Sequence, residues 1–485
     1  MEKQISAEEI QRYPLPDLSR VEALLAAEVE QSRHKIIVLD DDPTGIQTIH
    51  DVSVYTDWTR ESLRQGFQAP GRLFFLLTNS RSLTAEETTA VHIEIGENVA
   101  AVAHELGMEY LIMNRGDSTL RGHYPLETEL LRMVAERASG QGMDGEILCP
   151  FFKEGGRFTI DNIHYVKYDD VLVPCGQTEF AGDETFGYQS SDLRAYVEEK
   201  TAHACRAENV TCISLARLRA LDYEGVEAQL ESVRNYGRIV VNAVDDCDVR
   251  VLATALYRAL AKGHRYTICC AAALVKAMGN ITDRPCLTRP ELVTGSVGTG
   301  GIIVVGSHTK KTTAQLEELK KCSRIEFIEM NSDLVLQSGG LEAETAAIVA
   351  RCDALLAAGR VCCVSTKRAL LSVENDRPED ALMRSVKISD ALQQCVGRLS
   401  VAPAFVVAKG GITSSDVGVK ALGCRCARVL GQIRPGIPVW RTGPESRFPG
   451  VPYVIFPGNV GEEETLREAV EILMGEGPGA FSQYA

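Results

Sequence analysis

The sequence predicts an α/β protein with two α/β domains, each with a mostly parallel sheet flanked by helices. Short apolar runs, such as residues 36–39 and 73–77, alternate with longer amphipathic stretches, a pattern typical of parallel strands joined by helices. The 485 residues are enough for two or three domains. A segment rich in proline and glycine, residues 279–300, separates two such series. We therefore expect an N-terminal domain at residues 1–285 and a C-terminal domain at 286–485.

Composition narrows the class of protein. Hydrophobic residues make up 45% and charged residues 24%, as in ordinary soluble globular proteins. The net charge of −15 and the lack of a Lys/Arg-rich run argue against a nucleic-acid partner. No apolar stretch is long enough to span a membrane, and the N-terminus lacks a signal-peptide pattern. The fifteen cysteines are scattered and include no Cys-x-x-Cys pair, so we expect a reduced, cytoplasmic protein.

The expected elements of the N-terminal domain follow in order. An amphipathic helix near residues 21–31 should pack on this domain or against a partner subunit, which would make a homodimer. Thr84 and Glu87 form a capping-box pattern at the start of a long helix. Residues 178–183 are polar and irregular, and fit either a hairpin or a lid. Strands are expected at 36–39, 52–55, 73–77, 110–113, 146–149, 210–215 and 238–242. Helices are expected at 84–106 and 125–138, and a further helix should end at residue 260.

Three consecutive carboxylates are central to the N-terminal domain. Asp40, Asp41 and Asp42 directly follow the buried strand at residues 36–39. In open α/β sheets, ligands bind in the crevice beyond the carboxyl ends of the strands. Neighbouring acids repel one another, so a cation, a hydroxyl or an amide donor should share the space. The alternative, that Asp42 or Thr44 only caps a helix, stays open.

Arginines occur at the ends of the neighbouring strands. Arg81 follows the strand at residues 73–77, and Arg115 and Arg121 follow the strand at 110–113. Guanidinium groups bind carboxylates in a bidentate fork, and carboxylates accept hydrogen bonds from hydroxyls. Because the carboxyl ends of parallel strands meet at one edge, we expect a site there for a small anionic or polyol ligand.

The C-terminal domain repeats the pattern with different residues at the strand ends. Three of its strands end in turns rich in glycine and hydroxyl side chains, which can present backbone N–H groups to the phosphates of a nucleotide. A P-loop is excluded because its Gly-x-x-x-x-Gly-Lys-Ser/Thr motif is absent. Each turn alone is also compatible with a simple reversal of the chain. Strands are expected at 301–306, 362–365, 405–408 and 454–456, and helices at 313–321 and 462–475.

These motifs, in this order, resemble the four-carbon acid sugar kinase family, which includes 3-oxo-tetronate, threonate and erythronate kinases. The resemblance covers most of residues 35–465, and its most specific element is Asp117-Ser118-Thr119-Leu120-Arg121-Gly122. The other matching pieces are Asp41-Asp42-Pro43-Thr44-Gly45, Thr78-Asn79-Ser80-Arg81, Gly156-Arg157, Thr178-Glu179-Phe180 with Asp183, Gly306-Ser307 with Thr312 and Gln315, Gly410-Gly411-Ile412-Thr413 and Gly458-Asn459-Val460-Gly461.

Four positions depart from the family pattern. Arg115 and His123 stand where the family often has Lys and Asn, and Ile412 stands where Glu is common. Phe456-Pro457 replaces a lysine that commonly precedes the last glycine turn. His123 fits either a contact with a sugar acid or a structural role.

The resemblance implies ATP-dependent phosphorylation of a hydroxyl on a small sugar acid, with the active site in the cleft between the domains. Domain closure would exclude water. Mg²⁺ would bridge the ATP phosphates through water, with few protein ligands. The implied roles are catalysis by Asp41 and Asp42, substrate contacts by Thr44, Ser80, Arg81, Arg115, Asp117, Ser118, Arg121 and Arg157, and nucleotide contacts by Ser307, Gly410, Gly411, Ile412, Thr413, Gly458 and Asn459.

Two other functions stay open at this stage. Asp40 and Asp42 after an apolar strand also resemble the aspartyl-phosphate phosphatase signature, with Asp40 as the nucleophile and Asp42 as the acid/base. That chemistry needs a later lysine and an acid pair; Asp245 and Asp246 could be the pair, but no lysine is well placed before them. The other alternative is a non-catalytic sugar-acid sensor that kept both pockets, against which the intact acids argue.

Overall fold

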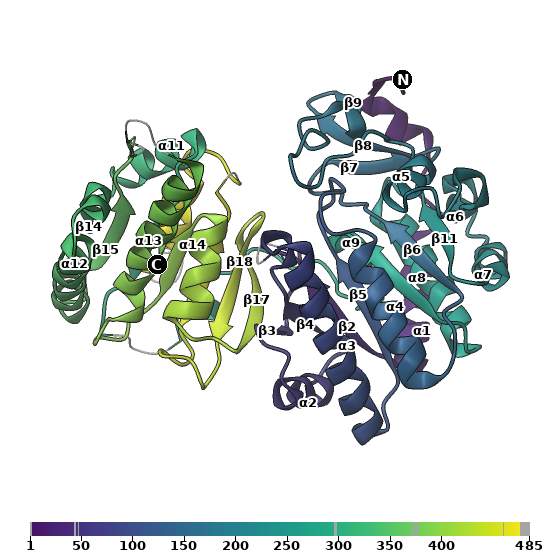
Figure 1. Cartoon of the computed structure of the whole chain (residues 1–485), viewed down its shortest axis with the longest axis horizontal. Coiled ribbons are helices and arrows are strands. Elements are labelled where there is room, and N and C mark those ends of the chain that lie inside the picture. The colour runs from purple at the N-terminus through teal and green to yellow at the C-terminus, as the bar shows by residue number, and fades with distance from the viewer. Residues whose placement is uncertain are drawn as a thin grey trace, which may run out of the picture. The chain divides into compact units, whose positions relative to one another are not determined.

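The protein divides into two compact units. In this computed structural model, the first unit comprises Met1–Gly45 and Asp57–Thr282, and the second comprises Ile46–Thr56 and Asp283–Ala485. Figure 1 shows the helices and strands of each unit. The structure describes residues 2–42, 45–46, 48–294, 298–369, 371, 373, 377–458 and 460–475.

The main sheet of the first unit is parallel throughout, in the order β10-β11-β6-β12-β5-β2-β4. Asp40, the last residue of β2, lies level with Arg115 of β5 and Leu77 of β4, so these three strands end at one edge. The strands are β2 (Lys35–Asp40), β4 (Leu73–Leu77), β5 (Tyr110–Arg115), β6 (Gly145–Cys149), β10 (Thr211–Ile213), β11 (Gly237–Val241) and β12 (Tyr266–Cys270).

Helices pack in pairs beside this sheet. The capping box of Thr84 and Glu87 begins α3, as the sequence predicts. Helix α1 packs against α8 and buries Val21 and Leu25, so the apolar face of the leader helix is covered within its own unit. The helices are α1 (Leu18–Gln31), α2 (Arg60–Gln68), α3 (Ala85–Leu106), α4 (Leu126–Ser139), α5 (Leu193–Lys200), α6 (Leu215–Arg219), α7 (Tyr223–Ser232), α8 (Asp246–Ala261) and α9 (Ala272–Met278).

A small antiparallel sheet completes the first unit, and the sequence analysis missed it. Its strands follow the order β1-β9-β8-β7, with β1 (Ile5–Ser6), β7 (Arg157–Ile160), β8 (Ile163–Tyr168) and β9 (Val171–Pro174). The β7–β8 hairpin turns through Asp161 and Asn162, both with positive φ, and the Asp-Asn pair was the available signal for it. Residues 178–183 form turns rather than a hairpin.

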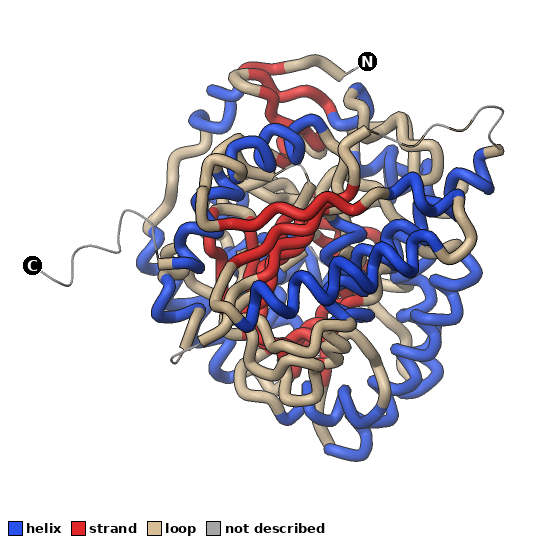
Figure 2. Tube along the Cα trace, turned by 90° about the vertical axis from the view of Figure 1, so that its left-hand side faces the viewer, coloured by secondary structure: helices blue, strands red, loops and turns tan. Residues whose placement is uncertain are grey.

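The second unit has a mixed sheet in the order β3-β17-β18-β19-β16-β13-β15-β14. The last five of these strands are parallel, and β17 and β18 form an antiparallel hairpin. Figure 2, with this unit toward the viewer, shows strands side by side and flanked by helices. The strands are β3 (Val52–Tyr55), β13 (Ile302–Val305), β14 (Ile325–Met330), β15 (Val361–Thr366), β16 (Val406–Lys409), β17 (Cys426–Arg434), β18 (Ile437–Thr442) and β19 (Pro452–Phe456).

One strand of the second unit comes from early in the chain. The sequence predicts that all of residues 1–285 belong to one domain, whereas the structure groups residues 46–56 with the C-terminal part. The reason is that β3 pairs antiparallel with β17, from Val52 opposite Val429 to Tyr55 opposite Cys426. The helices of the second unit are α10 (Arg289–Leu292), α11 (Lys310–Leu319), α12 (Gly340–Ala357), α13 (Pro378–Gly397), α14 (Gly411–Asp416) and α15 (Thr465–Met474).

The predicted fold class is confirmed, since both units combine a mostly parallel sheet with flanking helices. A functional cleft between the domains stays a prediction. Within the described part of the chain, no helix has the length and apolar character needed to cross a bilayer.

Candidate functional site

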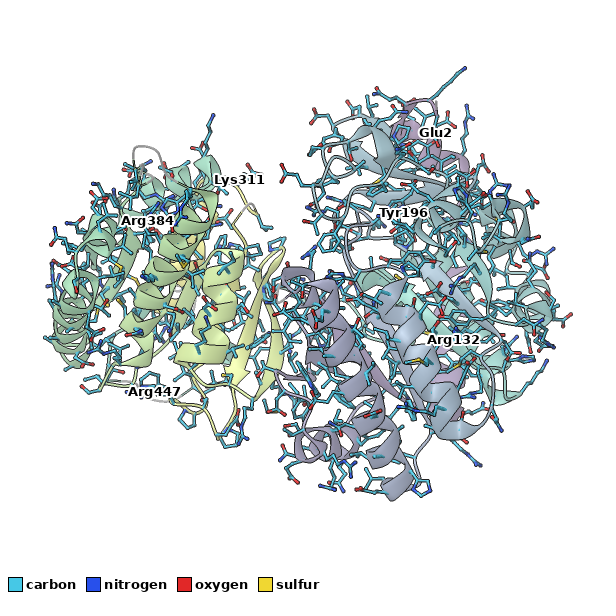
Figure 3. The ribbon with its side chains drawn as sticks, viewed as in Figure 1. Glu2, Arg132, Tyr196, Lys311, Arg384 and Arg447 are labelled. Carbon is cyan, nitrogen blue, oxygen red and sulfur yellow. The ribbon has the colours of Figure 1, made fainter. Side chains whose placement is uncertain are left out.

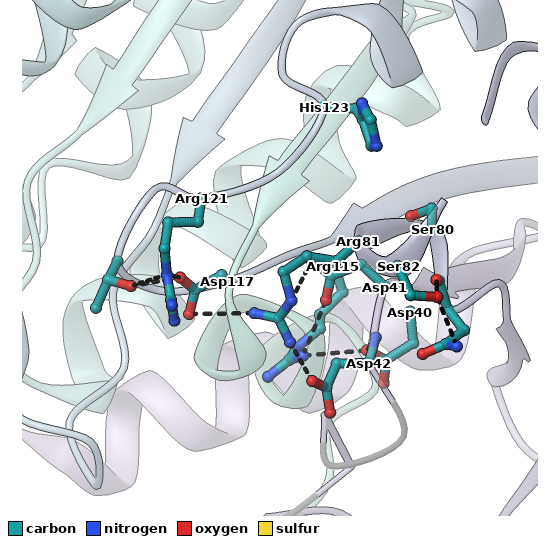
Figure 4. A network of polar contacts seen from close by, with 12 residues as sticks. Asp40, Asp41, Asp42, Ser80, Arg81, Ser82, Arg115, Asp117, Arg121 and His123 are labelled. Atoms are coloured by element: carbon teal, nitrogen blue, oxygen red, sulfur yellow. Dashed lines mark hydrogen bonds and ion pairs between the residues drawn. The ribbon is translucent and has the colours of Figure 1, made fainter. Parts of the chain in front are cut away.

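Four carboxylates and three guanidinium groups meet at the carboxyl edge of the first unit's sheet. We call them the acid–arginine cluster (Figure 4): Asp40, Asp41, Asp42, Asp117, Arg81, Arg115 and Arg121. They come from the ends of β2, β4 and β5, which the parallel register places side by side. The sequence analysis expected these residues at one edge, and the structure brings them together there.

Two arginines bracket the three consecutive acids. Arg115 Nη1 donates to Asp40 Oδ1 at 3.0 Å and lies 3.7 Å from Asp41 Oδ1. Arg81 donates to Asp42, and its Nε lies 3.9 Å from Asp41 Oδ2. Asp40 and Asp42 are therefore each tied to one guanidinium, whereas Asp41 lies between the two arginines at longer distances.

Asp117 is held by two further contacts. Arg121 Nε donates to Asp117 Oδ2 at 2.7 Å, and Arg81 Nη1 lies 3.6 Å from Oδ1. Burial alone would raise the pKa of Asp117, but Arg121 and Arg81 outweigh it and hold the pKa below its ordinary value. Asp117 is therefore an ionised hydrogen-bond acceptor at neutral pH.

Asp41 differs from Asp117 in its environment. It is 4% exposed, and its Oδ1 has no hydrogen-bond partner among the described residues. Burial raises the pKa of Asp41 well above its ordinary value, although Arg81 and Arg115 act in the opposite direction. A Cβ at Gly116 would lie 3.6 Å from Asp41 Oδ2, and one at Gly122 would lie 3.9 Å away. The two glycines thus keep side chains away from this oxygen.

Arg157, at the start of β7, is an unpaired cation beside the cluster. Its side chain makes no hydrogen bond or ion pair with the described residues, and its Nε is buried without a partner among them. Its guanidinium lies 5.5 Å from the centre of the Phe180 ring, and that of Arg121 lies 5.0 Å from the same ring. Burial lowers the pKa of Arg157 from its ordinary value. An unpaired arginine of this kind is suited to an incoming carboxylate.

The turn that carries Asp117 and Arg121 is fixed through its backbone. Leu120 has φ +68°, an uncommon value for a side chain other than glycine. Three successive carbonyls of the turn accept hydrogen bonds: Ser118 O from His164 Nε2 at 2.8 Å, Thr119 O from the Tyr188 hydroxyl at 2.7 Å, and Leu120 O from the Tyr196 hydroxyl at 3.0 Å (Tyr196 is labelled in Figure 3). The sequence did not predict these three donors, because they lie 46 to 76 residues after the turn and no motif links them to it.

Some predicted site residues lie elsewhere. Ser80 is buried and donates to Glu127 at 2.6 Å, so its hydroxyl points away from the cluster. Ser118 is buried and enters the turn mainly through its backbone carbonyl. His123 Nε2 lies 3.0 Å from Leu83 O and away from the cluster in Figure 4, which favours its structural role. Thr44 and Asn459 lie outside the described residues.

The residues of the phosphatase alternative are engaged in other contacts. Asp40 is 1% exposed and pairs with Arg115, which leaves it poorly placed to attack a substrate. Asp245 is the N-cap of α8 and also accepts from Lys153 Nζ at 2.6 Å. The contacts of Asp40 and Asp245 therefore do not support the phosphatase alternative, which needs a free nucleophile near a pair of acids.

Three turns converge at the carboxyl edge of the second unit's sheet. They follow β13, β16 and β19, and carry Ser307, Gly410 and Gly458. A Cβ at Gly410 would lie 3.1 Å from Ser307 Cβ, and one at Gly458 would lie 3.0 Å from Ser307 Oγ. Gly410 also has φ +126°, which favours glycine. Glycine therefore allows the three backbone turns to approach one another closely.

Hydroxyl groups link these turns. Thr312 Oγ1 donates to Gly458 O at 2.9 Å and lies 3.0 Å from Ser307 Oγ. Thr309 caps α11 and lies 3.0 Å from Gly458 O through its Oγ1. Thr413 is buried, and a Cβ added at Gly306 would lie only 2.2 Å from the Thr413 Oγ1.

The predicted nucleotide residues Gly411 and Ile412 begin α14. An added Cβ at Gly411 would meet nothing within 4 Å, so this position opens toward solvent. The Ile412 side chain is 75% exposed.

Two cations of this edge have few partners, and neither was a predicted site residue. Lys409 is fully buried; its Nζ donates to Pro457 O and lies 4.1 Å from the centre of the Phe456 ring. Burial, with a smaller effect of Lys311, lowers the pKa of Lys409 to about 7. Arg368 Nη2 donates to Ser307 O at 2.7 Å, while its Nε and Nη1 are buried without partners among the described residues. These donors can serve an anion.

No three His, Cys, Asp or Glu side chains of the described residues are grouped so as to hold a metal ion.

Two family models match the chain. One, described as a sugar-binding N-terminal domain, matches residues 36–278. The other, described as a nucleotide-binding C-terminal domain, matches residues 302–466. The chain thus combines a sugar-binding and a nucleotide-binding domain. No curated protein matches the chain.

Solved structures share the fold. A Salmonella typhimurium LT2 protein, solved under the provisional name of a tRNA synthase, is 15% identical with a TM-score of 0.65, over 89% of this chain and 98% of that one. Haemophilus influenzae protein HI1011, described by the family model DUF1537, is 16% identical with a TM-score of 0.59, over 90% of this chain and 100% of that one.

Proposed function

Because this chain belongs to the four-carbon acid sugar kinase family, we propose that it is a kinase that phosphorylates a hydroxyl of a small sugar acid with ATP. The proposed substrates are four-carbon acids such as threonate, erythronate or a 3-oxo-tetronate. The acid–arginine cluster and the glycine-rich turns support this assignment, since one suits a hydroxylated acid and the other a nucleotide.

Arg157 is the observation that carries the proposal. The arginines of the cluster already hold carboxylates, whereas Arg157 pairs with no carboxylate of the described residues. The substrate carboxylate would pair with Arg157, with Phe180 beside the guanidinium. The substrate hydroxyls would donate to Asp42 and Asp117, which accept hydrogen bonds when ionised.

Asp41 is the proposed general base. Its Oδ1 has no hydrogen-bond partner in the described part of the chain, its Oδ2 faces Gly116 and Gly122, and burial raises its pKa. A carboxylate whose pKa is raised toward the working pH accepts a proton more effectively than an ordinary one. Asp41 would take the proton of the attacking hydroxyl, while Arg81 and Arg115 hold the carboxylate in place. Phosphoryl transfer otherwise depends on positioning and charge neutralisation.

The second unit would bind ATP at its three turns. The close approach at Gly410 and Gly458, the Ser307 hydroxyl and the unpartnered nitrogens of Arg368 fit phosphate groups. Mg²⁺, when bound to the ATP phosphates, would neutralise part of their charge. Because the described residues contain no metal cluster, we assign Mg²⁺ no protein ligands.

The test is release of ADP from MgATP in the presence of D- and L-threonate, D- and L-erythronate, 3-oxo-tetronates and longer aldonates. Substrate-dependent ADP release whose KM for the sugar acid rises in Arg157→Ala supports the proposal. Release of phosphate from sugar-acid phosphates instead would support the phosphatase alternative. Binding of a sugar acid without either reaction would support a sensor.

A further inference from the structure

A buried carboxylate supports the acid–arginine cluster. Glu127, in the first turn of α4, is 5% exposed. Its Oε1 accepts a hydrogen bond from the Ser80 hydroxyl at 2.6 Å, and its Oε2 accepts one from Asn114 Nδ2 at 2.6 Å. The buried ring of His92 lies with Nε2 3.6 Å from Oε1. One carboxylate thus joins α4 to the ends of β4 and β5.

The residues that Glu127 binds are the chain neighbours of the two arginines that bracket Asp41. Ser80 precedes Arg81, and Asn114 precedes Arg115. Successive residues of a strand point to opposite faces, so a bond that fixes Asn114 also fixes the direction of Arg115. Ser80 begins the short helical turn Ser80–Ser82, which carries Arg81.

The position of Glu127 on α4 does not by itself explain its burial. An acid in the first turn is stabilised by the helix dipole even when it is exposed. Glu129, in the same turn, keeps a third of its side chain exposed and pairs with Arg132 and Arg238. Burial of a carboxylate is unfavourable unless hydrogen bonds compensate it, and for Glu127 those bonds go to the two residues beside the site arginines.

We propose that Glu127 is a positioning residue of the substrate site. Through Ser80 and Asn114 it sets the geometry in which Arg81 and Arg115 hold the Asp41 carboxylate. The kinetic part of this inference rests on the proposed kinase function. The geometric part does not, and it is tested separately.

Hydrogen exchange tests the geometry. The amides of Ser82 and Leu83 bond to Asn79 O at 3.0 Å and to Ser80 O at 2.9 Å. In Glu127→Ala the Ser80–Ser82 turn loses the hydrogen bond between the Ser80 hydroxyl and Glu127, so both amides exchange about tenfold faster or more. Glu136→Ala is the matched control, because Glu136 lies on the same helix, is half-exposed and pairs with Arg132. It leaves these two amides unchanged.

Steady-state kinetics test the consequence for substrate. Glu127→Gln keeps the size of the side chain but has one acceptor oxygen instead of two. The kcat/KM for the sugar acid falls about 10–100-fold, since misplacement of a positioning group by about 1 Å has effects of this size. The KM for ATP stays the same. A merely structural role would instead lower the melting temperature and reduce the amount of active enzyme, with both KM values unchanged.

Unchanged exchange at Ser82 and Leu83 in Glu127→Ala would overturn the proposal, and so would an unchanged sugar-acid kcat/KM in Glu127→Gln. If the wild-type protein phosphorylates no sugar acid, the proposed function fails while the exchange result still decides the positioning role. If Glu127→Ala does not fold, Ser80→Ala and Asn114→Ala each remove one tie, and exchange at the same amides is compared.

Discussion

The main sheet of the first unit and the sheet of the second unit each have an edge formed by the carboxyl ends of parallel strands, but the groups at these two edges differ in chemistry. At the first edge, the acid–arginine cluster presents charged side chains that are tied to one another. At the second edge, the backbone turns at Ser307, Gly410 and Gly458 approach one another closely. The cations Lys409 and Arg368 lie beside them and bond to backbone carbonyls of these turns. The same scaffold can therefore recognise a ligand through fixed side-chain charges or through close approach of the backbone.

This difference determines what each edge tolerates. The first edge should be sensitive to a change of charge that leaves side-chain size unchanged. The second should be sensitive to an added methyl group that leaves charge unchanged. The following four expectations test the contrast, from the largest effect to the smallest.

Asp41→Asn should have the largest effect. The substitution keeps the shape of the side chain but removes the proposed base, so we expect kcat to fall about 10²–10⁴-fold. The acid limb of the pH profile, which lies at higher pH than for an ordinary aspartate because burial raises the pKa of Asp41, should disappear. Asp170→Asn, at an exposed acid of the same unit, is the control. An unchanged kcat would remove Asp41 from the proposed mechanism.

Arg157→Ala should raise the KM for the sugar acid about 10–100-fold, since a hydrogen bond to a charged group contributes about 1.5–3 kcal/mol. The melting temperature should not fall, because Arg157 has no ion pair with the described residues to lose. Arg115→Ala gives the contrast: it leaves Asp40 buried without its partner and should destabilise the fold by about 3–5 kcal/mol. Equal destabilisation by the two substitutions would show that Arg157 is structural.

Gly410→Ala should weaken ATP binding about tenfold or more, because φ +126° strains a side chain and the added Cβ lies 3.1 Å from Ser307 Cβ. Sugar-acid binding, measured by calorimetry without nucleotide, should not change. Gly450→Ala controls for backbone strain alone, since Gly450 has φ +75° and nothing lies within 4 Å of its added Cβ. Equal losses of ATP affinity in both variants would assign the effect to strain.

Lys409→Met should change the pH dependence of stability. The folded protein holds the pKa of Lys409 at about 7, below its ordinary value of 10.5. Between these values the unfolded chain binds more protons, so this group makes the free energy of unfolding rise with pH. Removing it should lower the slope by up to about 1.4 kcal/mol per pH unit between pH 7.5 and 9, measured by urea unfolding. An identical slope would contradict the assignment.

The sequence predicted the parallel sheets and the first edge well, for one physical reason. Apolar runs mark buried strands, and the residues after parallel strands share an edge, so Asp41, Arg81 and Arg115 could be placed together from their positions alone. The individual roles proposed for them stay predictions.

The parts that the sequence did not predict depend on contacts between distant residues. His164 and Tyr196 reach the Asp117 turn across 46 and 76 residues, and Ser80 reaches Glu127 across 47. The spacing of residues along the sequence does not predict such contacts. The motif therefore predicted a ligand contact for Ser80, and nothing distinguished Glu127 from other residues of its helix. Lys409 was missed in the same way, since its position at a strand end does not show that its amine is buried.

The pairing of β3 with β17 has a practical consequence for dissecting the protein. A fragment that begins at Asp283 lacks β3 and leaves one edge of β17 without its partner. Unsatisfied strand edges are prone to pair with other chains. Fragment complementation, in which a peptide of residues 46–56 is supplied in trans, is therefore the natural way to obtain the nucleotide-binding part alone, and its solubility would report directly on that strand.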